Sequence, residues 1–119
     1  MASKPEVEKF LQELKVKISV FGILFLDDRG KNQQALLDME IAPAKRREII
    51  ERLTPEDYSE GPLPETMRGL LPMWVFGKTM AAVNIYIKIT MGRANNSAVC
   101  ISFHLAERPM NFPLKNQII

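Results

Sequence analysis

The sequence is poor in the residues that form covalent cross-links and metal centres. Its 119 residues contain one cysteine, Cys100, and one histidine, His104. A single cysteine excludes an internal disulfide and suits a reducing compartment, so we expect a cytoplasmic protein. The two side chains are four residues apart, which is roughly 13 Å along a strand, and a zinc site needs more ligands than these. The sequence therefore predicts no metal centre and no cofactor.

Long apolar segments are lacking as well. The longest run covers residues 18–26, has nine residues and is interrupted by Ser19 and Gly22. A membrane-spanning helix needs about twenty apolar residues. The N-terminal residues are polar and acidic, unlike a secretory signal. These features favour a protein that has no membrane partner.

Two common catalytic motifs are missing from the chain. Neither the Gly-x-Ser-x-Gly turn of serine hydrolases nor the Gly-x-x-x-x-Gly-Lys phosphate loop occurs. The composition is that of a globular protein, with 46% hydrophobic and 25% charged residues. We interpret residues 1–119 as a single domain. Residues 109–119 are expected to be an irregular tail, because Pro109 and Pro113 break regular structure.

The net charge of +2 is unevenly distributed. Residues 1–60 hold ten Lys and Arg against twelve Asp and Glu, a net charge of −2, whereas residues 61–119 hold six against two, a net charge of +4. A basic half of this size permits a polyanionic partner such as RNA but does not require one.

The N-terminal region has a clear helix signal. Ser3 and Glu6 form a capping-box pattern, and apolar residues follow at helical spacing, which predicts a helix over residues 4–14. Residues 16–26 then alternate apolar and polar side chains before becoming nearly all apolar, which predicts an extended segment. Within it Gly22 is expected at a bulge or kink.

The next segments are read from turn and cap residues. Residues 27–30, Asp-Asp-Arg-Gly, predict a turn. Residues 32–39 fit a short helix or a strand, and the helix is favoured. Pro43 suits a first helical position, and residues 45–53 carry an apolar helical face.

The C-terminal half predicts strands. Thr54 is expected to cap a short helical turn that passes Tyr58 and ends at Gly61. A connection rich in Gly and Pro follows over residues 61–72. Strands are predicted over residues 73–76, 85–91 and 98–106. The result is an α+β fold, with N-terminal helices on a small antiparallel sheet formed mainly by the C-terminal half.

The last two predicted strands each have one apolar and one polar face, because side chains alternate along a strand. The polar faces hold Tyr86, Lys88 and Thr90 on one strand and Cys100, Ser102 and His104 on the other. If a hairpin over residues 92–97 pairs Thr90 with Ala98, Lys88 faces Cys100, Tyr86 faces Ser102, and His104 is diagonal to Tyr86.

This set of side chains suits RNA cleavage without a metal. The reaction needs a general base, a cation for the charged phosphorane and an acid for the leaving oxygen. His104 is the candidate base or acid, Lys88 or Arg93 the cation, and Tyr86 a hydrogen-bond donor. The candidate RNA-binding residues are Lys78, Arg93, Ser102 and Arg108, with Glu60 and Trp74 as further candidates.

The same residues also fit an ordinary strand pair. A lone histidine in a strand is more often structural than catalytic, and Tyr86 and Lys88 are common on exposed sheet faces. Trp74 and Phe76 are expected in the core, with base stacking by Trp74 the less favoured role.

Four blocks of the sequence resemble the motility-quorum-sensing-regulator (MqsR) toxin family. They are residues 53–58 (Leu-Thr-Pro-Glu-Asp-Tyr), Trp74, residues 85–90 (Ile-Tyr-Ile-Lys-Ile-Thr) and residues 101–104 (Ile-Ser-Phe-His). Those toxins are RelE-like mRNA interferases of bacterial type II toxin–antitoxin systems. The resemblance implies a RelE-like α+β fold, metal-independent endoribonuclease activity on mRNA, and a cognate antitoxin as partner.

The resemblance also assigns roles to residues. Tyr86 matches the family's functional tyrosine and Lys88 the lysine of the same strand, while His104 stands where members usually have a lysine. Glu60 and Val75 replace a lysine and a glutamine of the family pattern. Two interpretations follow from these replacements: a diverged nuclease that uses His104, or a catalytically inactive RelE-like binding module that acts through protein or RNA contacts.

Overall fold

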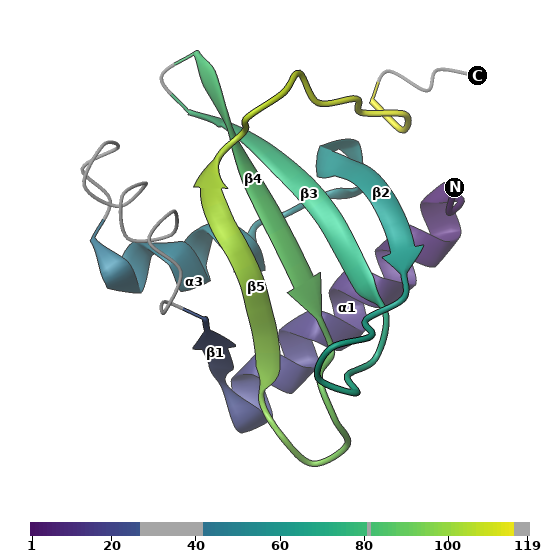
Figure 1. The fold of residues 1–119 in the computed structure, drawn as a ribbon, viewed down its shortest axis with the longest axis vertical. Coiled ribbons are helices and arrows are strands. Elements are labelled where there is room, and N and C mark those ends of the chain that lie inside the picture. The colour runs from purple at the N-terminus through teal and green to yellow at the C-terminus, as the bar shows by residue number, and fades with distance from the viewer. Residues whose placement is uncertain (27–41, 81, 116–119) are drawn as a thin grey trace.

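The computed structural model describes residues 1–26, 42–80 and 82–115 (Figure 1). A sheet forms one layer and helix α1 crosses behind it as the second layer. The described elements are α1 (Lys4–Phe21), β1 (Ile23–Phe25), α3 (Pro43–Glu51), the 3-10 turn η1 (Pro55–Asp57), β2 (Tyr58–Leu63), β3 (Met73–Met80), β4 (Val83–Thr90) and β5 (Ala98–Leu105). The predicted α+β class is confirmed. The predictions over residues 27–30 and 32–39 lie outside the described residues.

The five-stranded sheet has the order β1-β5-β4-β3-β2. Neighbouring strands are antiparallel except β1, which runs parallel to β5. The expected antiparallel sheet is therefore a mixed one. The cause is the course of α1, which carries the chain behind the sheet to the end where β5 begins (Figure 1). A strand that starts there must run in the same direction as β5.

Helix α1 is longer than predicted. Its capping box is present as expected, with the Glu6 amide donating to Ser3 Oγ and the Ser3 amide to the Glu6 carboxylate. The extended segment predicted over residues 16–26 is wrong up to Phe21, where the helix ends, and is confirmed for Ile23–Phe25, which form β1. Ile18 is buried and Val16 and Val20 are exposed, so burial on the sheet outweighs the local strand pattern. Gly22 ends the helix with a φ of 79° and donates its amide to the Ile18 carbonyl at 2.8 Å.

The segment after Thr54 also differs from prediction. A 3-10 turn forms over Pro55–Asp57, but the chain then enters strand β2 instead of ending a helix at Gly61. Tyr58 decides this. Its ring is fully buried, and its hydroxyl accepts a hydrogen bond from the Ala2 amide at 3.0 Å and donates one to the Gly61 carbonyl.

The core lies between α1 and the sheet. Five apolar residues of the helix are buried there: Val7, Phe10, Leu11, Leu14 and Ile18. The Phe10 ring stacks on Trp74 with 4.5 Å between centroids. Helix α3 adds Ile49 and Ile50, and its Arg46 guanidinium lies 4.0 Å from the centroid of the Phe25 ring. None of the described helices is long and apolar enough to cross a membrane.

Candidate functional site

Four of the polar residues singled out from the sequence lie on the face of the sheet opposite α1, named the outer face below: Tyr86, Lys88, Ser102 and His104. Strands β4 and β5 send one set of alternating side chains to the core and the other to this face. On β4 the core receives Ile85, Ile87 and Ile89, which leaves Tyr86 and Lys88 on the outer face. The alternation predicted for β4 is therefore confirmed.

The β4–β5 hairpin forms, but its register differs from the predicted one. Tyr86 lies opposite His104, and Lys88 lies opposite Ser102. The pairing then shifts, so that Ile89 lies opposite Cys100 and Ile101 is the extra residue of a β-bulge. The predicted pairs of Thr90 with Ala98, Lys88 with Cys100 and Tyr86 with Ser102 are wrong. The pairing is offset by one residue at the turn, where Thr90 lies opposite Val99, and the bulge adds a second offset.

The bulge also reverses the faces of the first half of β5. Cys100 was expected on the polar face, but it is fully buried in the core cluster with α1. On the outer face, Thr90 lies opposite Val99. The buried thiol packs as a small apolar side chain, and the one-residue offset at Ile101 turns it toward the core. Cys100 therefore contributes to packing and leaves the outer face to Ser102 and His104.

Tyr86 and His104 form a stacked pair. Their ring centroids are 5.2 Å apart and the ring planes differ by 14°. His104 Nδ1 lies 2.8 Å from the Leu105 carbonyl oxygen. A carbonyl can only accept, so Nδ1 carries a proton and Nε2 holds the lone pair when the imidazole is neutral. The pair thus presents one basic nitrogen in a fixed orientation.

The surroundings of Tyr86 keep its hydroxyl protonated. Burial is the main cause that raises the pKa of this phenol above 10.0, and the negative charge of Glu60 raises it further. The Lys88 ammonium lies 5.8 Å from the centroid of the Tyr86 ring. The site therefore combines a phenol that keeps its proton, the amino group of Lys88 and the ring of His104.

Glu60 reaches the outer face through an irregularity in β2. The β2–β3 register shifts between Tyr58 and Glu60, so that Tyr58 is in the core while Glu60 lies opposite Val75. Val75 in turn lies opposite Lys88. This places the Glu60 carboxylate two strands from the Lys88 ammonium. The negative charge of Glu60 reduces the net positive charge of the site.

The C-terminal segment forms one border of the site. Gly77 lies opposite Tyr86, and the Met110 sulfur and the Phe112 ring lie over it. A Cβ added at Gly77 would be 2.8 Å from Met110 Sδ and from Phe112 Cε1 and Cζ. Sequence reasoning missed these three residues, because nothing local to residues 106–115 indicates that the chain returns across the sheet.

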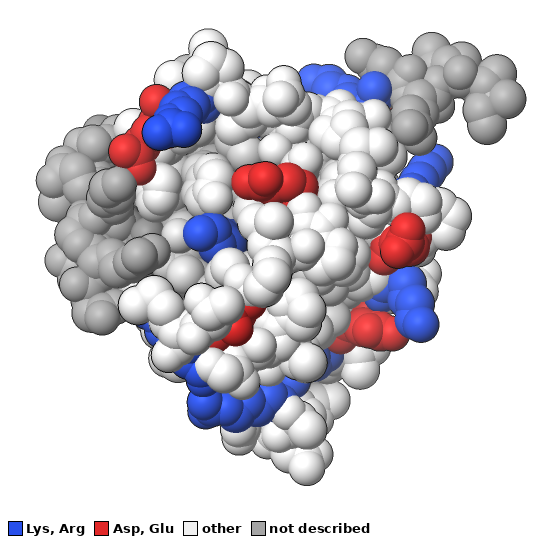
Figure 2. Space-filling view, turned by 45° about the vertical axis from the view of Figure 1, so that its right-hand side comes forward, with Lys and Arg blue, Asp and Glu red and all other residues white. Residues whose placement is uncertain are grey.

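The predicted RNA-binding residues do not form one surface. Lys78 is on the same side of β3 as Trp74 and Phe76, and its Nζ lies 3.5 Å from the Asp57 carboxylate. Trp74 stacks on Phe10, on the helix side. Ser102 is on the outer face but only 2% exposed. In Figure 2 charged side chains appear as separate spots among uncharged ones over the middle of the molecule.

The two predicted arginines lie at opposite ends of β5. Arg93 is in the loop before this strand and Arg108 follows it, and both are exposed. Of all the candidates, Tyr86, Lys88, His104 and Glu60 lie together around the stacked pair, with the buried Ser102 opposite Lys88.

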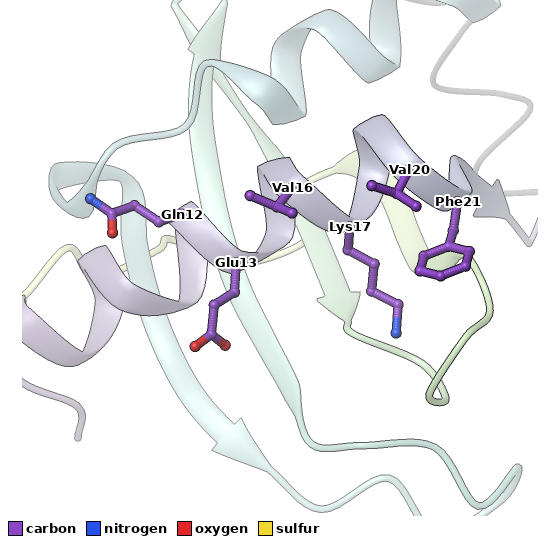
Figure 3. Close-up of a pocket in the computed structure, with 6 residues that line it drawn as sticks. All are labelled: Gln12, Glu13, Val16, Lys17, Val20 and Phe21. Atoms are coloured by element: carbon purple, nitrogen blue, oxygen red, sulfur yellow. The ribbon is translucent and has the colours of Figure 1, made fainter.

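Two further observations concern metal ligands and the exposed surface of α1. Among the described residues, no group of three or more His, Cys, Asp or Glu is placed to hold a metal ion. An open groove of about 500 Å³ lies on the exposed side of α1, lined by Gln12, Glu13, Val16, Lys17, Val20 and Phe21 (Figure 3). This groove is on the helix layer, away from the outer face.

Comparison with protein-family models, with curated proteins and with solved structures finds no match to the chain.

Proposed function

We propose that this protein is a metal-independent endoribonuclease that cleaves mRNA, with a RelE-like fold, and that it acts as a toxin held inactive by a cognate antitoxin. The observation that carries the proposal is the stacked Tyr86–His104 pair with Lys88 beside it. The sequence blocks shared with the MqsR family support the toxin role.

The arrangement suits cleavage by the neighbouring 2′-hydroxyl. His104 Nε2 takes the proton from that hydroxyl, and the 2′-oxygen then attacks phosphorus. The bond from phosphorus to the 5′-oxygen breaks, which leaves a 2′,3′-cyclic phosphate and a 5′-hydroxyl end. The Lys88 ammonium stabilises the negative charge that grows on the phosphoryl oxygens.

Tyr86 acts as a hydrogen-bond donor in this scheme. A phenol with a raised pKa is a weak acid, so it donates a hydrogen bond to a phosphoryl oxygen and keeps its proton. The leaving 5′-oxygen takes its proton from water. The Tyr86 ring also fixes the imidazole by stacking, which limits the cost of orienting the base.

The test uses His104→Asn, whose side-chain amide can still donate to the Leu105 carbonyl but has no basic nitrogen. We expect purified wild-type protein to cleave single-stranded RNA in excess EDTA and to leave cyclic phosphate ends. His104→Asn should lower the rate about 10²-fold or more, the usual contribution of a general base. Arg52→Gln, on the exposed end of α3, is the matched control and should keep full activity.

Expression in bacteria gives a second readout. Wild-type protein should arrest growth and degrade mRNA, and His104→Asn should relieve both effects. Normal growth at a confirmed high level of folded wild-type protein, together with intact RNA in the purified assay, would overturn the proposal.

The second candidate is a binding module of the same fold without catalysis. The replacement of two family positions by Glu60 and Val75 favours it, since a carboxylate near Lys88 weakens its attraction for phosphate. RNA binding without cleavage in the purified assay would identify this function.

A further inference from the structure

Three basic residues from distant parts of the sequence are linked by side-chain to backbone hydrogen bonds at the end of the sheet where β4 turns into β5. Lys17 comes from α1, Arg68 from the β2–β3 loop and Arg93 from the β4–β5 loop. Lys17 Nζ donates to the Arg93 carbonyl oxygen at 2.7 Å, and Arg93 Nη2 donates to the Arg68 carbonyl oxygen. Figure 3 shows Lys17 extending away from α1 on this side. These three residues are named the basic anchor.

The loops that carry the basic anchor are tied to each other and to the sheet. The Glu65 carboxylate accepts hydrogen bonds from the amides of Met67, Arg68 and Leu70, at 2.9 to 3.2 Å. The Leu71 amide donates to the Gly92 carbonyl at 3.0 Å, which joins the two loops. A charged group held in place in this way loses little freedom when it binds a ligand.

The hydrogen bonds within the basic anchor leave it able to bind an anion. An ammonium has three donors and a guanidinium five, and a bond to one carbonyl uses one of them. Arg93 is exposed, and the Arg68 side chain is 36% exposed. The nearby acids are Glu65, which lies 3.7 Å from Arg68 and is almost fully buried, and Glu13, one turn before Lys17 on α1. In Figure 2 blue side chains gather at the lower end of the molecule.

We propose that the basic anchor binds the phosphate backbone of single-stranded RNA away from the bond that is cleaved. The identity of this ligand rests on the proposed function. Strand β4 connects the two sites: Thr90, at its end, is four residues beyond Tyr86, roughly 13 Å. Lys88 lies between them on the outer face. Thr90 is fully buried and donates to the Leu71 carbonyl at 2.6 Å. An RNA strand that follows β4 from Tyr86 therefore passes over the β2–β3 loop, which carries Arg68, before it reaches Arg93 at the turn. Lys17 lies on the helix side of this end of the sheet.

The chemistry of the basic anchor favours a phosphate backbone over an acidic protein segment. Two of its three cations are arginines, whose planar fork matches phosphate oxygens with paired hydrogen bonds. Phosphates also recur along an RNA strand, so the same strand can occupy Lys88 and the anchor together. Nothing in the chemistry of an acidic polypeptide would extend its binding from the basic anchor to the stacked pair.

The experiment measures binding of the full chain to a fluorescent 2′-O-methyl RNA dodecamer, which has no 2′-hydroxyl to attack, over a range of salt concentrations. Arg68→Gln and Lys17→Gln are compared with wild type and with Arg52→Gln, which removes the same charge from α3. Arg93 is left intact because its guanidinium also links the loops. Each anchor variant should make the slope of log K against log salt shallower by about 0.7, the value for one single-strand phosphate contact. Arg52→Gln should keep the wild-type slope.

The outcomes separate the inference from the function on which it rests. Equal slopes for the anchor variants and Arg52→Gln overturn the basic anchor, even if wild-type protein cleaves unmodified RNA. Shallower slopes with no cleavage of unmodified RNA support the anchor and overturn the nuclease. Displacement of the RNA by polyglutamate of equal charge at equal concentration overturns the assignment to RNA in favour of an acidic protein ligand.

Discussion

Replacing Gly77 by alanine is expected to lower the free energy of unfolding when Met110 and Phe112 cover the residue. It is expected to raise this free energy when both side chains are truncated. The backbone at Gly77 lies outside the left-handed region, so alanine can adopt it without strain. The obstacle is space, because the new Cβ would be 2.8 Å from the Met110 sulfur and from two Phe112 ring atoms. Carbon atoms in favourable contact are about 3.5–4.0 Å apart. Something must therefore move by most of an ångström.

The magnitude follows from two opposing effects. Adding a methyl group to a filled site costs about 1–3 kcal/mol. Replacing glycine by alanine gains about 0.4–1 kcal/mol, because the unfolded chain loses conformational freedom. The net expectation for Gly77→Ala is a loss of about 1.3 kcal/mol in the free energy of unfolding, within a range of about 0–2.6 kcal/mol. The strained atoms are side-chain ends on an irregular segment, so this segment moves and the sheet stays intact.

A double-mutant cycle isolates the contact. A Met110→Ala/Phe112→Ala background removes the three atoms that lie nearest to the added Cβ at Gly77. The same Gly77→Ala change should then stabilise the protein, by about 0.4–1 kcal/mol. Leu114 is buried in the core cluster and should keep the remainder of the segment attached in all four proteins.

The assay is urea unfolding followed by circular dichroism and by the fluorescence of the single tryptophan, Trp74. Limited proteolysis reports the C-terminal segment separately, and Gly77→Ala should expose it to cleavage. A loss of stability of the same size in both backgrounds would refute the reasoning, since it would place the cost in the strand and not in the contact with Met110 and Phe112.

Three other predictions follow from single side chains. Tyr86 has a phenol pKa above 10.0 in the fold, so the free energy of unfolding should fall as pH rises above about 10. Tyr86→Phe should remove this loss. Glu60→Gln should lower the phenol pKa of Tyr86 in an absorbance titration. Glu65 has a carboxyl pKa below 4.5, chiefly because its carboxylate accepts a hydrogen bond from the Leu70 amide. The free energy of unfolding should therefore fall as pH decreases below about 4.5. Glu65→Gln should flatten this part of an acid-unfolding curve. Tyr58→Phe leaves two buried backbone groups unpaired and should cost about 1–3 kcal/mol in urea unfolding; no measurable loss would contradict the burial of its hydroxyl.

Much of the local structure could be predicted from residue patterns. The capping box at Ser3 and Glu6 marks the start of α1 because its hydrogen bonds join residues three apart. Strand β4 was predicted from alternation alone, since Ile85, Ile87 and Ile89 need a core and their neighbours do not. The capping box and the alternation each depend on a few neighbouring residues, and both are present in the structure.

The end of α1 could not be predicted in the same way. Val16, Ile18 and Val20 alternate with polar residues as a strand would, yet only Ile18 is buried. The helix is preferred because it places Leu14 and Ile18 together against the sheet. That preference depends on elements far along the sequence, such as β5, against which α1 packs.

For the candidate site, the sequence by itself determined which side chains share a strand and which chemistry they can support. Tyr86 and Lys88 were placed on one face of β4 because strand periodicity is a local property. The tertiary structure decided which of them meet. The bulge at Ile101 stacks His104 on Tyr86 and sends Cys100 to the core, and the return of the chain brings Phe112 over Gly77. Register and long-range return depend on packing of the whole sheet, and no local pattern carries that information.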